Sequence, residues 1–290
     1  MSTARVALRS NRRPLLLLLI LPVAWMTVFY LIPIGVLLTH ALFSVKYPKI
    51  DHHLTLVNFQ TFVDTELYIR VLVRTVVMAV GVTLCDLLLA FPVAFWLARR
   101  VRRNREIALF LVIFPLWSSY LIRIFAWKTL LGTSGILNSF LQWAHITNAP
   151  LSFLLYSKWS ILIALTHIWL PFMILPLYTV LDRIPESLLE AANDLGAGSV
   201  AAFRTVVLPL AKPGIVAGGL TTFSLTMGDY IAPTLLGGPG DQMIGKLIAD
   251  QFGVANNWPL GAMLIIPVLL IISTILLLAN RAGAMERTAG

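Results

Sequence analysis

The stretch EAANDLGAGSVAAFRTVVLPLAKP, residues 190–213, is polar but lies between long apolar runs, and it predicts two short helices joined by glycines. The second helix is expected over residues 199–207, after which Pro209 and Pro213 mark the return of the chain to the membrane. Such a hairpin cannot lie in lipid and must project into water or into a partner protein. The charged residues of this stretch and its flank are Asp182, Arg183, Glu186, Glu190, Asp194, Arg204 and Lys212.

Two different starts are possible for the first helix of this hairpin. Pro185 fits the first turn, where a missing N–H costs nothing. Ser187 with Glu190 matches a capping box that would start the helix two residues later. Gly196 and Gly198 are expected to end it, because glycine readily takes the left-handed conformation that stops a helix. The apolar stripe of this helix consists of Leu188, Leu189, Ala192 and Leu195.

The composition is that of an integral membrane protein. Of the 290 residues, 58% are hydrophobic and only 12% are charged, whereas soluble domains carry about 25% charged residues. The mean hydropathy is +0.85. The formal net charge of +9 comes from short clusters beside apolar runs, where it sets membrane topology, so it does not indicate a nucleic-acid partner. The only cysteine, Cys85, lies in an apolar run, which excludes an intrachain disulfide.

Six apolar runs are long enough to cross a membrane as helices, so the predicted fold is an all-α polytopic membrane protein. The first run is longer than the 7–15 residues of a signal-peptide core and has no small-residue cleavage site, which favours a helix that is kept. Pro171 and Pro176 are expected to break the fourth span. The six spans are predicted at residues 14–38, 74–98, 107–127, 159–180, 214–236 and 259–279.

Positive charge is distributed unevenly between the two sides of the membrane, which predicts that both termini and the hairpin are cytoplasmic. The residues placed inside are Arg5, Arg9, Arg12, Arg13, the five arginines of residues 99–105, Arg183, Arg204, Lys212, Arg281 and Arg287. The residues placed outside are Lys46, Lys49, Arg70, Lys128, Lys158 and Lys246. The arginines of residues 99–105 are interpreted as a topology signal only, with no ligand.

The hairpin resembles the membrane subunits of binding-protein-dependent ABC importers, whose pattern is E-A-A-x3-G-x9-I-x-L-P. Every spacing matches, and the single departure is Val206 in place of isoleucine. The resemblance implies an ABC type-1 importer permease fold, with a coupling helix that docks on a cytoplasmic ATPase. The residues that carry this coupling role are then Glu190, Ala191, Ala192, Gly196, Leu208 and Pro209.

Other stretches resemble the spermidine and putrescine permeases of that family. They are residues 115–131, 132–141, 170–185, 228–248 and 256–263. Permeases for other cationic amines, opines, aminoethylphosphonate, thiamine or ferric iron share much of this pattern. The implied partners are an ATPase dimer, a second and different permease subunit, a periplasmic solute-binding protein and lipid of the bacterial inner membrane.

The resemblance also implies a division of the chain. Residues 1–69 are expected to hold the cytoplasmic N-terminus, the first helix and the first periplasmic loop. Residues 70–280 are expected to form the type-1 transmembrane domain of five helices, with the coupling loop at residues 182–213. Residues 281–290 are expected to form a cytoplasmic tail.

Charged residues inside the spans cost about 2.5–3.5 kcal/mol each on insertion scales and therefore need a reason. Arg123 and Asp229 are predicted at similar depth, so they could form a buried ion pair. Alternatively, Asp229 lines the translocation path and attracts an ammonium group; Gly228 and Pro233 indicate irregular backbone there. Asp86 is interpreted as structural or as facing the partner permease, and His167 as a hydrogen-bonded packing residue. The candidate path residues are Asp229, Tyr230, Trp117 and Arg123.

The sequence contains no metal-ligand cluster, phosphate-binding loop or nucleophile–base pair, so no cofactor, metal or catalytic residue is predicted. ATP hydrolysis must then belong to a separate chain. A secondary transporter driven by an ion gradient is the alternative from another class, and it would be expected to show inverted repeats and proton-relay residues. An intramembrane enzyme would need a catalytic constellation.

Overall fold

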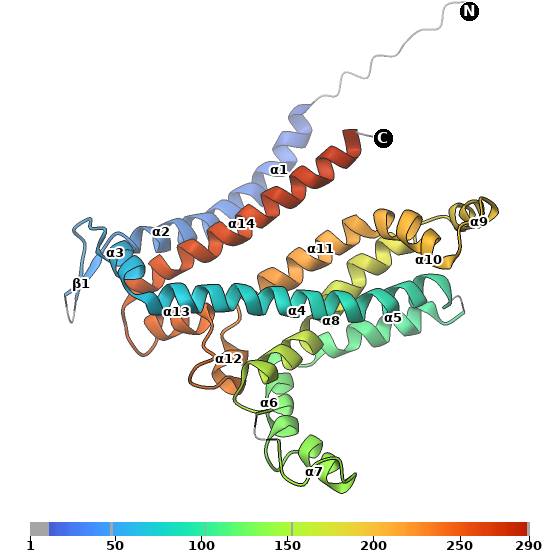
Figure 1. The fold of residues 1–290 in the computed structure, drawn as a ribbon. Helices are drawn as coiled ribbons and strands as arrows, with labels where there is room; N and C mark the ends of the chain where they lie inside the picture. The colour runs from blue at the N-terminus through green and yellow to red at the C-terminus, as the bar shows by residue number, and fades with distance from the viewer. Residues whose placement is uncertain (1–11, 47–48, 102, 152, 289–290) are drawn as a thin grey trace, which may run out of the picture.

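The computed structural model describes residues 12–46, 49–101, 103–151 and 153–288, which form a bundle of long helices with shorter elements at both ends (Figure 1). The predicted N-terminal arginines Arg5 and Arg9 lie outside these residues. In chain order the elements are α1 (Arg12–Met26), a π-helix (Thr27–Leu31), α2 (Ile32–His40), β1 (Ser44–Lys46), β2 (Lys49–Asp51), α3 (Val57–Asp64), α4 (Glu66–Arg99), α5 (Arg105–Ile113), a 3-10 helix (Phe114–Trp117), α6 (Tyr120–Leu131), α7 (Ile136–Trp143), α8 (Lys158–Leu181), α9 (Glu186–Asp194), α10 (Ser199–Ala202), a π-helix (Phe203–Val207), α11 (Leu208–Met227), α12 (Ile231–Leu236), α13 (Ile244–Phe252) and α14 (Trp258–Thr288).

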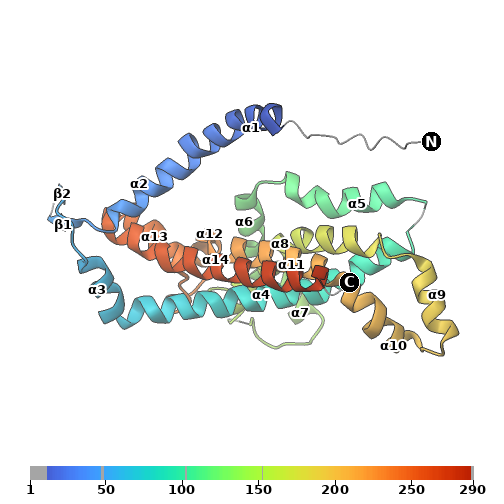
Figure 2. The same ribbon diagram turned by 90° about the horizontal axis from the view of Figure 1, so that it is seen from above.

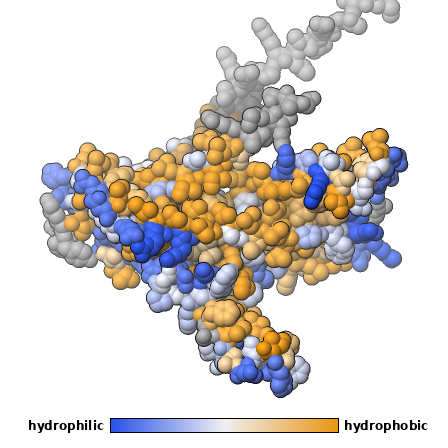
Figure 3. Space-filling view, viewed as in Figure 1, coloured by the Kyte–Doolittle hydropathy of each residue, from blue (hydrophilic) through white to orange (hydrophobic). Residues whose placement is uncertain are grey.

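The centre of the bundle is formed by α4, α8 and α11, and α14 packs on α11 and α13. Of the described residues, five helices are long and apolar enough to cross a membrane, and a sixth crossing is reached if one bent pair counts as a span. In a space-filling view, hydrophobic residues cover much of the visible flank, and hydrophilic residues gather toward its ends (Figure 3). The all-α membrane fold is therefore confirmed.

The first span is helical from Arg12 to His40. A π-helical segment at Thr27–Leu31 joins α1 to α2. None of its apolar window is buried in this chain. Figure 2 shows α1 standing apart from the bundle, while α2 contacts α14. The loop that follows holds the antiparallel pair β1–β2 and the short helix α3, and α4 begins at Glu66, ahead of the predicted position 74.

The third span is not the single helix predicted over residues 107–127. The segments Arg105–Trp117 and Tyr120–Trp143 meet at an angle of 88°. The cause is local: Pro115 lies in a 3-10 turn, and Ser118 and Ser119 then take extended backbone with ψ of 147° and 134°. As a result, α6 and α7 project sideways from the bundle (Figure 1).

The fourth span does not break at Pro171 and Pro176 as predicted, because α8 continues through both. It is the most buried of the candidate spans, with 56% of its apolar window inside the structure. Neighbouring helices hold its shape where the prolines remove backbone hydrogen bonds. A Cβ at Gly214 of α11 would lie 2.9 Å from the carbonyl oxygen of Pro176, and one at Gly218 would lie 2.7 Å from Sδ of Met173. Gly214 and Gly218 are four residues apart, on one face of α11, and the absence of side chains there allows α8 and α11 to pack closely.

The fifth span begins earlier than predicted. Residues Ser199–Met227 form one continuous helical stretch, in which a π-helical segment joins α10 to α11. Pro209 closely follows the π-helical segment, and Pro213 lies within α11. The two prolines therefore do not interrupt the return to the membrane, and the second arm of the hairpin is continuous with α11.

Candidate functional site

A break in the membrane-embedded helices positions the first candidate site. Helix α11 ends at Met227, and Gly228, Asp229 and Tyr230 lead into α12. The irregular backbone expected beside Asp229 is therefore present. Asp229 is only 6% exposed. Its Oδ1 accepts the backbone N–H of Ala232 at 2.9 Å, and its Oδ2 accepts the hydroxyl of Tyr120 from α6.

These residues line an open pocket of about 230 Å³, here called the aromatic pocket. The rings of Tyr120 and Trp169 stack with centroids 5.5 Å apart and an interplanar angle of 13°. Tyr230 is half-exposed. A carboxylate beside aromatic faces suits an organic cation, because ring faces attract ammonium groups within about 6 Å. The residues that line the pocket are Tyr120, Trp169, Leu225, Gly228, Asp229, Tyr230 and Ile231.

The wall behind Asp229 is formed by the first turn of α13. A Cβ at Gly245 would lie 2.5 Å from the carbonyl oxygen of Asp229 and 2.9 Å from its carbonyl carbon. Only glycine permits this approach. The N-terminus of α13 is itself fixed to α4, because the N–H of Ile244 donates to Oγ1 of Thr75 at 2.8 Å. The helix that packs behind Asp229 is therefore itself anchored to α4.

Of the four predicted path residues, Asp229 and Tyr230 line the pocket, and Arg123 and Trp117 do not. The alternative of an Arg123–Asp229 ion pair is wrong: within the part of the chain that the structure describes, no ion pair joins them. The Arg123 guanidinium carbon lies 5.9 Å from the Tyr120 ring centroid, and Nη1 donates to the carbonyl of Ile168 at 3.5 Å. Trp117 is 75% exposed.

The other intramembrane polar residues lie outside the pocket. Asp86 is fully buried in α4, and neither carboxylate oxygen has a hydrogen-bond partner among the described residues. His167 accepts a hydrogen bond at Nδ1 from Nε1 of Trp127 at 3.2 Å, as expected of a packing residue. The described residues contain no group of three or more His, Cys, Asp or Glu side chains that could hold a metal ion.

Sequence reasoning missed Tyr120 and Trp169. They lie within the third and fourth predicted apolar spans, at residues 107–127 and 159–180, where an aromatic side chain carries no signal of its own. Pro115 followed by the pair Ser118–Ser119 was the signal that could have revealed the bend. A bent span turns Tyr120 toward the break after α11, whereas a straight one would not.

The coupling loop, residues 182–213, projects beyond one end of the bundle as α9 and α10 (Figure 1). Gly196 has φ of +83°, as predicted. It ends α9 in a Schellman motif, in which the N–H of Gly196 bonds to Asn193 O at 2.9 Å and that of Ala197 to Ala192 O at 3.0 Å. Gly198 does not share this role: with φ of −66° and ψ of 165° it is extended and precedes α10.

The start of α9 also differs from both predicted forms. Pro185 has extended backbone and directly precedes the helix, and no side chain caps it, so the Ser187–Glu190 capping box is not formed. Glu190 and Ala191 are exposed, and Ala192 is half-buried. Leu188 and Leu195 of the apolar stripe are 43% and 89% exposed. Leu208 and Pro209 are also exposed, at the start of α11. The loop thus presents an unpartnered, partly apolar surface.

Comparisons with known proteins give relatives for almost the whole chain. Residues 71–284 match the family described as binding-protein-dependent transport system inner membrane component. The inner membrane ABC transporter permease protein YdcU of Escherichia coli K12 is 36% identical over 287 residues, which cover 94% of this chain and 90% of the relative. The spermidine/putrescine transport system permease protein PotB of Escherichia coli K12 is 35% identical over 264 residues, which cover 91% and 95%.

The fold is shared with solved importers. A chain of a bacterial alginate ABC transporter, solved in complex with an alginate pentasaccharide-bound periplasmic protein, superposes with a TM-score of 0.69 at 19% identity and 93% coverage of each chain. ABC importer permeases work with an ATPase, which hydrolyses the ATP, and with a periplasmic binding protein. The chain belongs to the binding-protein-dependent transport system inner membrane components and is the multi-pass permease subunit of an ABC importer.

Proposed function

We propose that this permease imports a polyamine such as spermidine or putrescine, and that the cation crosses the membrane by way of the aromatic pocket. The PotB relative is named for spermidine and putrescine and matches nearly the full length of this chain. The observation that carries the proposal is the pairing of Asp229 with the stacked rings of Tyr120 and Trp169. The carboxylate attracts an ammonium group, and the stacked rings give the methylene chain an apolar wall.

Asp229 fits this role better than a structural one. It has no cationic partner among the described residues, and its two hydrogen bonds come from a neutral hydroxyl and a backbone N–H. A carboxylate in this state remains available to an arriving cation. Tyr230 is 50% exposed at the same break and is positioned to guide the cation to it.

The coupling loop is proposed to lie in the cytoplasm with both termini, as the arginine asymmetry indicates. There α9 docks on an ATPase dimer through Glu190, Ala191 and Ala192. The exposed Leu195 adds apolar contact area. A second, different permease subunit completes the translocation path, and the periplasmic binding protein delivers the polyamine on the opposite side.

The experiment is spermidine uptake by the assembled importer with Asp229→Asn, which keeps the side-chain shape and removes the charge. Uptake is expected to fall at least about tenfold, the factor that corresponds to 1.4 kcal/mol, while the complex still assembles. Asp86→Asn is the matched control, because it makes the same change at a buried acid outside the pocket and is expected to retain uptake. Undiminished uptake by Asp229→Asn would reject the pocket as the cation path.

A further inference from the structure

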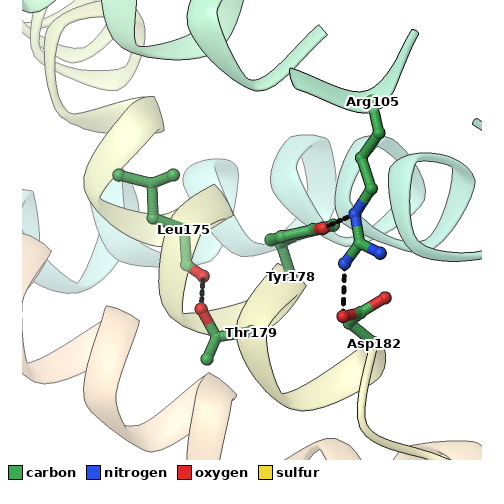
Figure 4. Close-up of polar contacts among 5 residues, drawn as sticks. All are labelled: Arg105, Leu175, Tyr178, Thr179 and Asp182. Atoms are coloured by element: carbon green, nitrogen blue, oxygen red, sulfur yellow. Dashed lines mark hydrogen bonds and ion pairs between the residues drawn. The ribbon is translucent and has the colours of Figure 1, made fainter.

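One arginine joins two segments at the base of the coupling loop. Arg105 is the first residue of α5. Its Nε donates to the hydroxyl of Tyr178, its Nη2 pairs with Oδ2 of Asp182, and its Cζ lies 5.0 Å from the Tyr178 ring centroid (Figure 4). These three residues are called the Arg105 cluster. Arg105 is therefore more than a topology signal, because it makes a specific tertiary contact with α8.

The cluster has a physical reason at each position. Asp182 caps the C-terminus of α8, where the helix dipole disfavours negative charge. Arg105 offsets that cost. Tyr178 is only 8% exposed and packs with Leu177 and Leu181, so its ring is fixed and its hydroxyl has a set position. The planar guanidinium reaches both partners at once, which the single ammonium of lysine cannot reproduce.

Asp182 lies at the point where α8 gives way to the coupling loop. Glu186, the first residue of α9, follows four positions later, and the intervening Ile184 is 6% exposed in the same apolar core. Holding Asp182 therefore fixes the direction in which α9 leaves the bundle. Within α8 the carbonyl of Leu175 accepts the hydroxyl of Thr179 at 2.8 Å (Figure 4), so that bond is local and does not involve α5.

The same segment reaches the aromatic pocket at its other end. From Arg105 the chain runs through α5 and the 3-10 turn to Tyr120, whose hydroxyl bonds to Asp229. Helix α5 is held to the bundle through one face only: Leu109 and Val112 pack on the apolar core, whereas Ile107 is 60% exposed. Side-chain contacts at residues 105 and 120 therefore tie the two ends of the segment 105–120, which consists of α5, the 3-10 turn and the start of α6.

We propose that Arg105 is a positioning residue that ties the coupling loop to α5, so that movement of the loop is passed to the aromatic pocket along residues 105–120. The inference rests on the proposed role of the coupling loop in docking the ATPase. It adds a specific route between the two sites. Breaking the Arg105 cluster should therefore uncouple the coupling loop from the aromatic pocket while leaving both sites intact.

The functional test is ATP hydrolysis by the assembled importer, with and without spermidine-loaded binding protein. Arg105→Gln and Asp182→Asn are each expected to lower the stimulation by loaded binding protein about fivefold or more, the range of typical coupling between sites. Basal hydrolysis should be retained. The double variant should be no worse than either single one, and exchange of the two charges, Arg105→Asp with Asp182→Arg, should restore part of the stimulation.

The matched control is Arg70→Gln, which removes an arginine from an ion pair with Glu66 within α4. The side chains of that pair are 59% and 81% exposed, and exposed pairs contribute little. Stimulation should be unchanged. If Arg105→Gln prevents assembly, two milder variants take its place. Arg105→Lys keeps the positive charge but removes the planar guanidinium, and Tyr178→Phe removes only the hydroxyl. Loss of assembly in these variants too, without recovery on charge exchange, would make the cluster purely structural and overturn the proposal.

A second measurement does not depend on the substrate. Because Cys85 is the only cysteine, a Cys85→Ser background allows spin labels at the exposed positions Ile107→Cys and Ala201→Cys. The distance distribution between α5 and the coupling loop should broaden in Arg105→Gln and Asp182→Asn, and not in Arg70→Gln. An unchanged distribution in both would overturn the proposal. Absence of spermidine stimulation in the parent importer would instead count against the polyamine assignment.

Discussion

The hydroxyl of Tyr120 donates a hydrogen bond to Oδ2 of Asp229, and these residues are 109 positions apart in the chain. One follows the sharp bend of the third span, and the other lies in the break between α11 and α12. Two irregular segments at membrane depth thus meet, and a hydroxyl of one donates a hydrogen bond to a carboxylate of the other. Irregular backbone is tolerated there only beside protein or a water-filled cavity, and here the two segments pack on each other beside an open pocket.

Tyr120→Phe should weaken import while keeping the stacked ring. Hydrogen bonds to charged groups contribute about 1.5–3 kcal/mol, so uptake at low spermidine concentration is expected to fall about tenfold or more. Initial rates over a range of spermidine concentrations would measure the change. Tyr30→Phe is the control, because Tyr30 is 60% exposed in the first span, outside the pocket. Equal rates for the two variants would show that the Tyr120 hydroxyl does not contribute.

Gly245→Ala should disturb the pocket from behind. The added methyl would meet the backbone of Asp229 at 2.5 Å, and such overpacking typically costs about 1–3 kcal/mol. We expect a lower thermal midpoint for the purified importer together with reduced uptake. Gly240→Ala provides the comparison, since nothing lies within 4 Å of a Cβ at that position. A thermal midpoint for Gly245→Ala equal to that of Gly240→Ala would contradict the close packing of α13.

Gly196 and Gly198 offer a matched pair within the coupling loop. A Cβ meets no atom within 4 Å at either position, so only the backbone conformation distinguishes them. Gly196→Ala forces a left-handed alanine, which costs about 1–2 kcal/mol. Gly198→Ala fits its extended backbone and should be neutral or slightly stabilising. Binding of the ATPase to the permease, measured with purified subunits, should weaken only for Gly196→Ala; equal affinities would remove the requirement for the Schellman turn.

Membrane orientation is checked with reporter fusions. Fusions after Arg103 and after Ala197 should report the cytoplasm, because both positions lie in segments on the arginine-rich side of the membrane. A fusion after Gly253, in the loop between α13 and α14, should report the opposite compartment. A periplasmic signal after Arg103 or Ala197 would reverse the proposed topology and separate the coupling loop from the ATPase.

The sequence predicted the membrane fold and the conformation of Gly196, because apolar length and left-handed glycines are local signals. It did not predict that α8 continues through Pro171 and Pro176, since that depends on the helices packed around it. It also did not predict the hydrogen-bond partner of Asp229, and the ion pair with Arg123, one of its two alternatives, is not formed in the described part of the chain. Depth along straight helices placed Arg123 beside it, whereas the bend at Ser118–Ser119 brings Tyr120 there instead.

The continuity of residues 199–227 has a mechanical consequence. This stretch of 29 residues is about 44 Å long at 1.5 Å per residue, with the coupling loop at one end and the Asp229 break at the other. If it moves as one body, a rotation of about 5° about one end displaces the other by about 4 Å over that length. Such a displacement exceeds the reach of the hydrogen bond between Tyr120 and Asp229. In the proposed mechanism, a modest tilt imposed where the coupling loop docks on the ATPase would be enough to separate Tyr120 from Asp229 and release the cation.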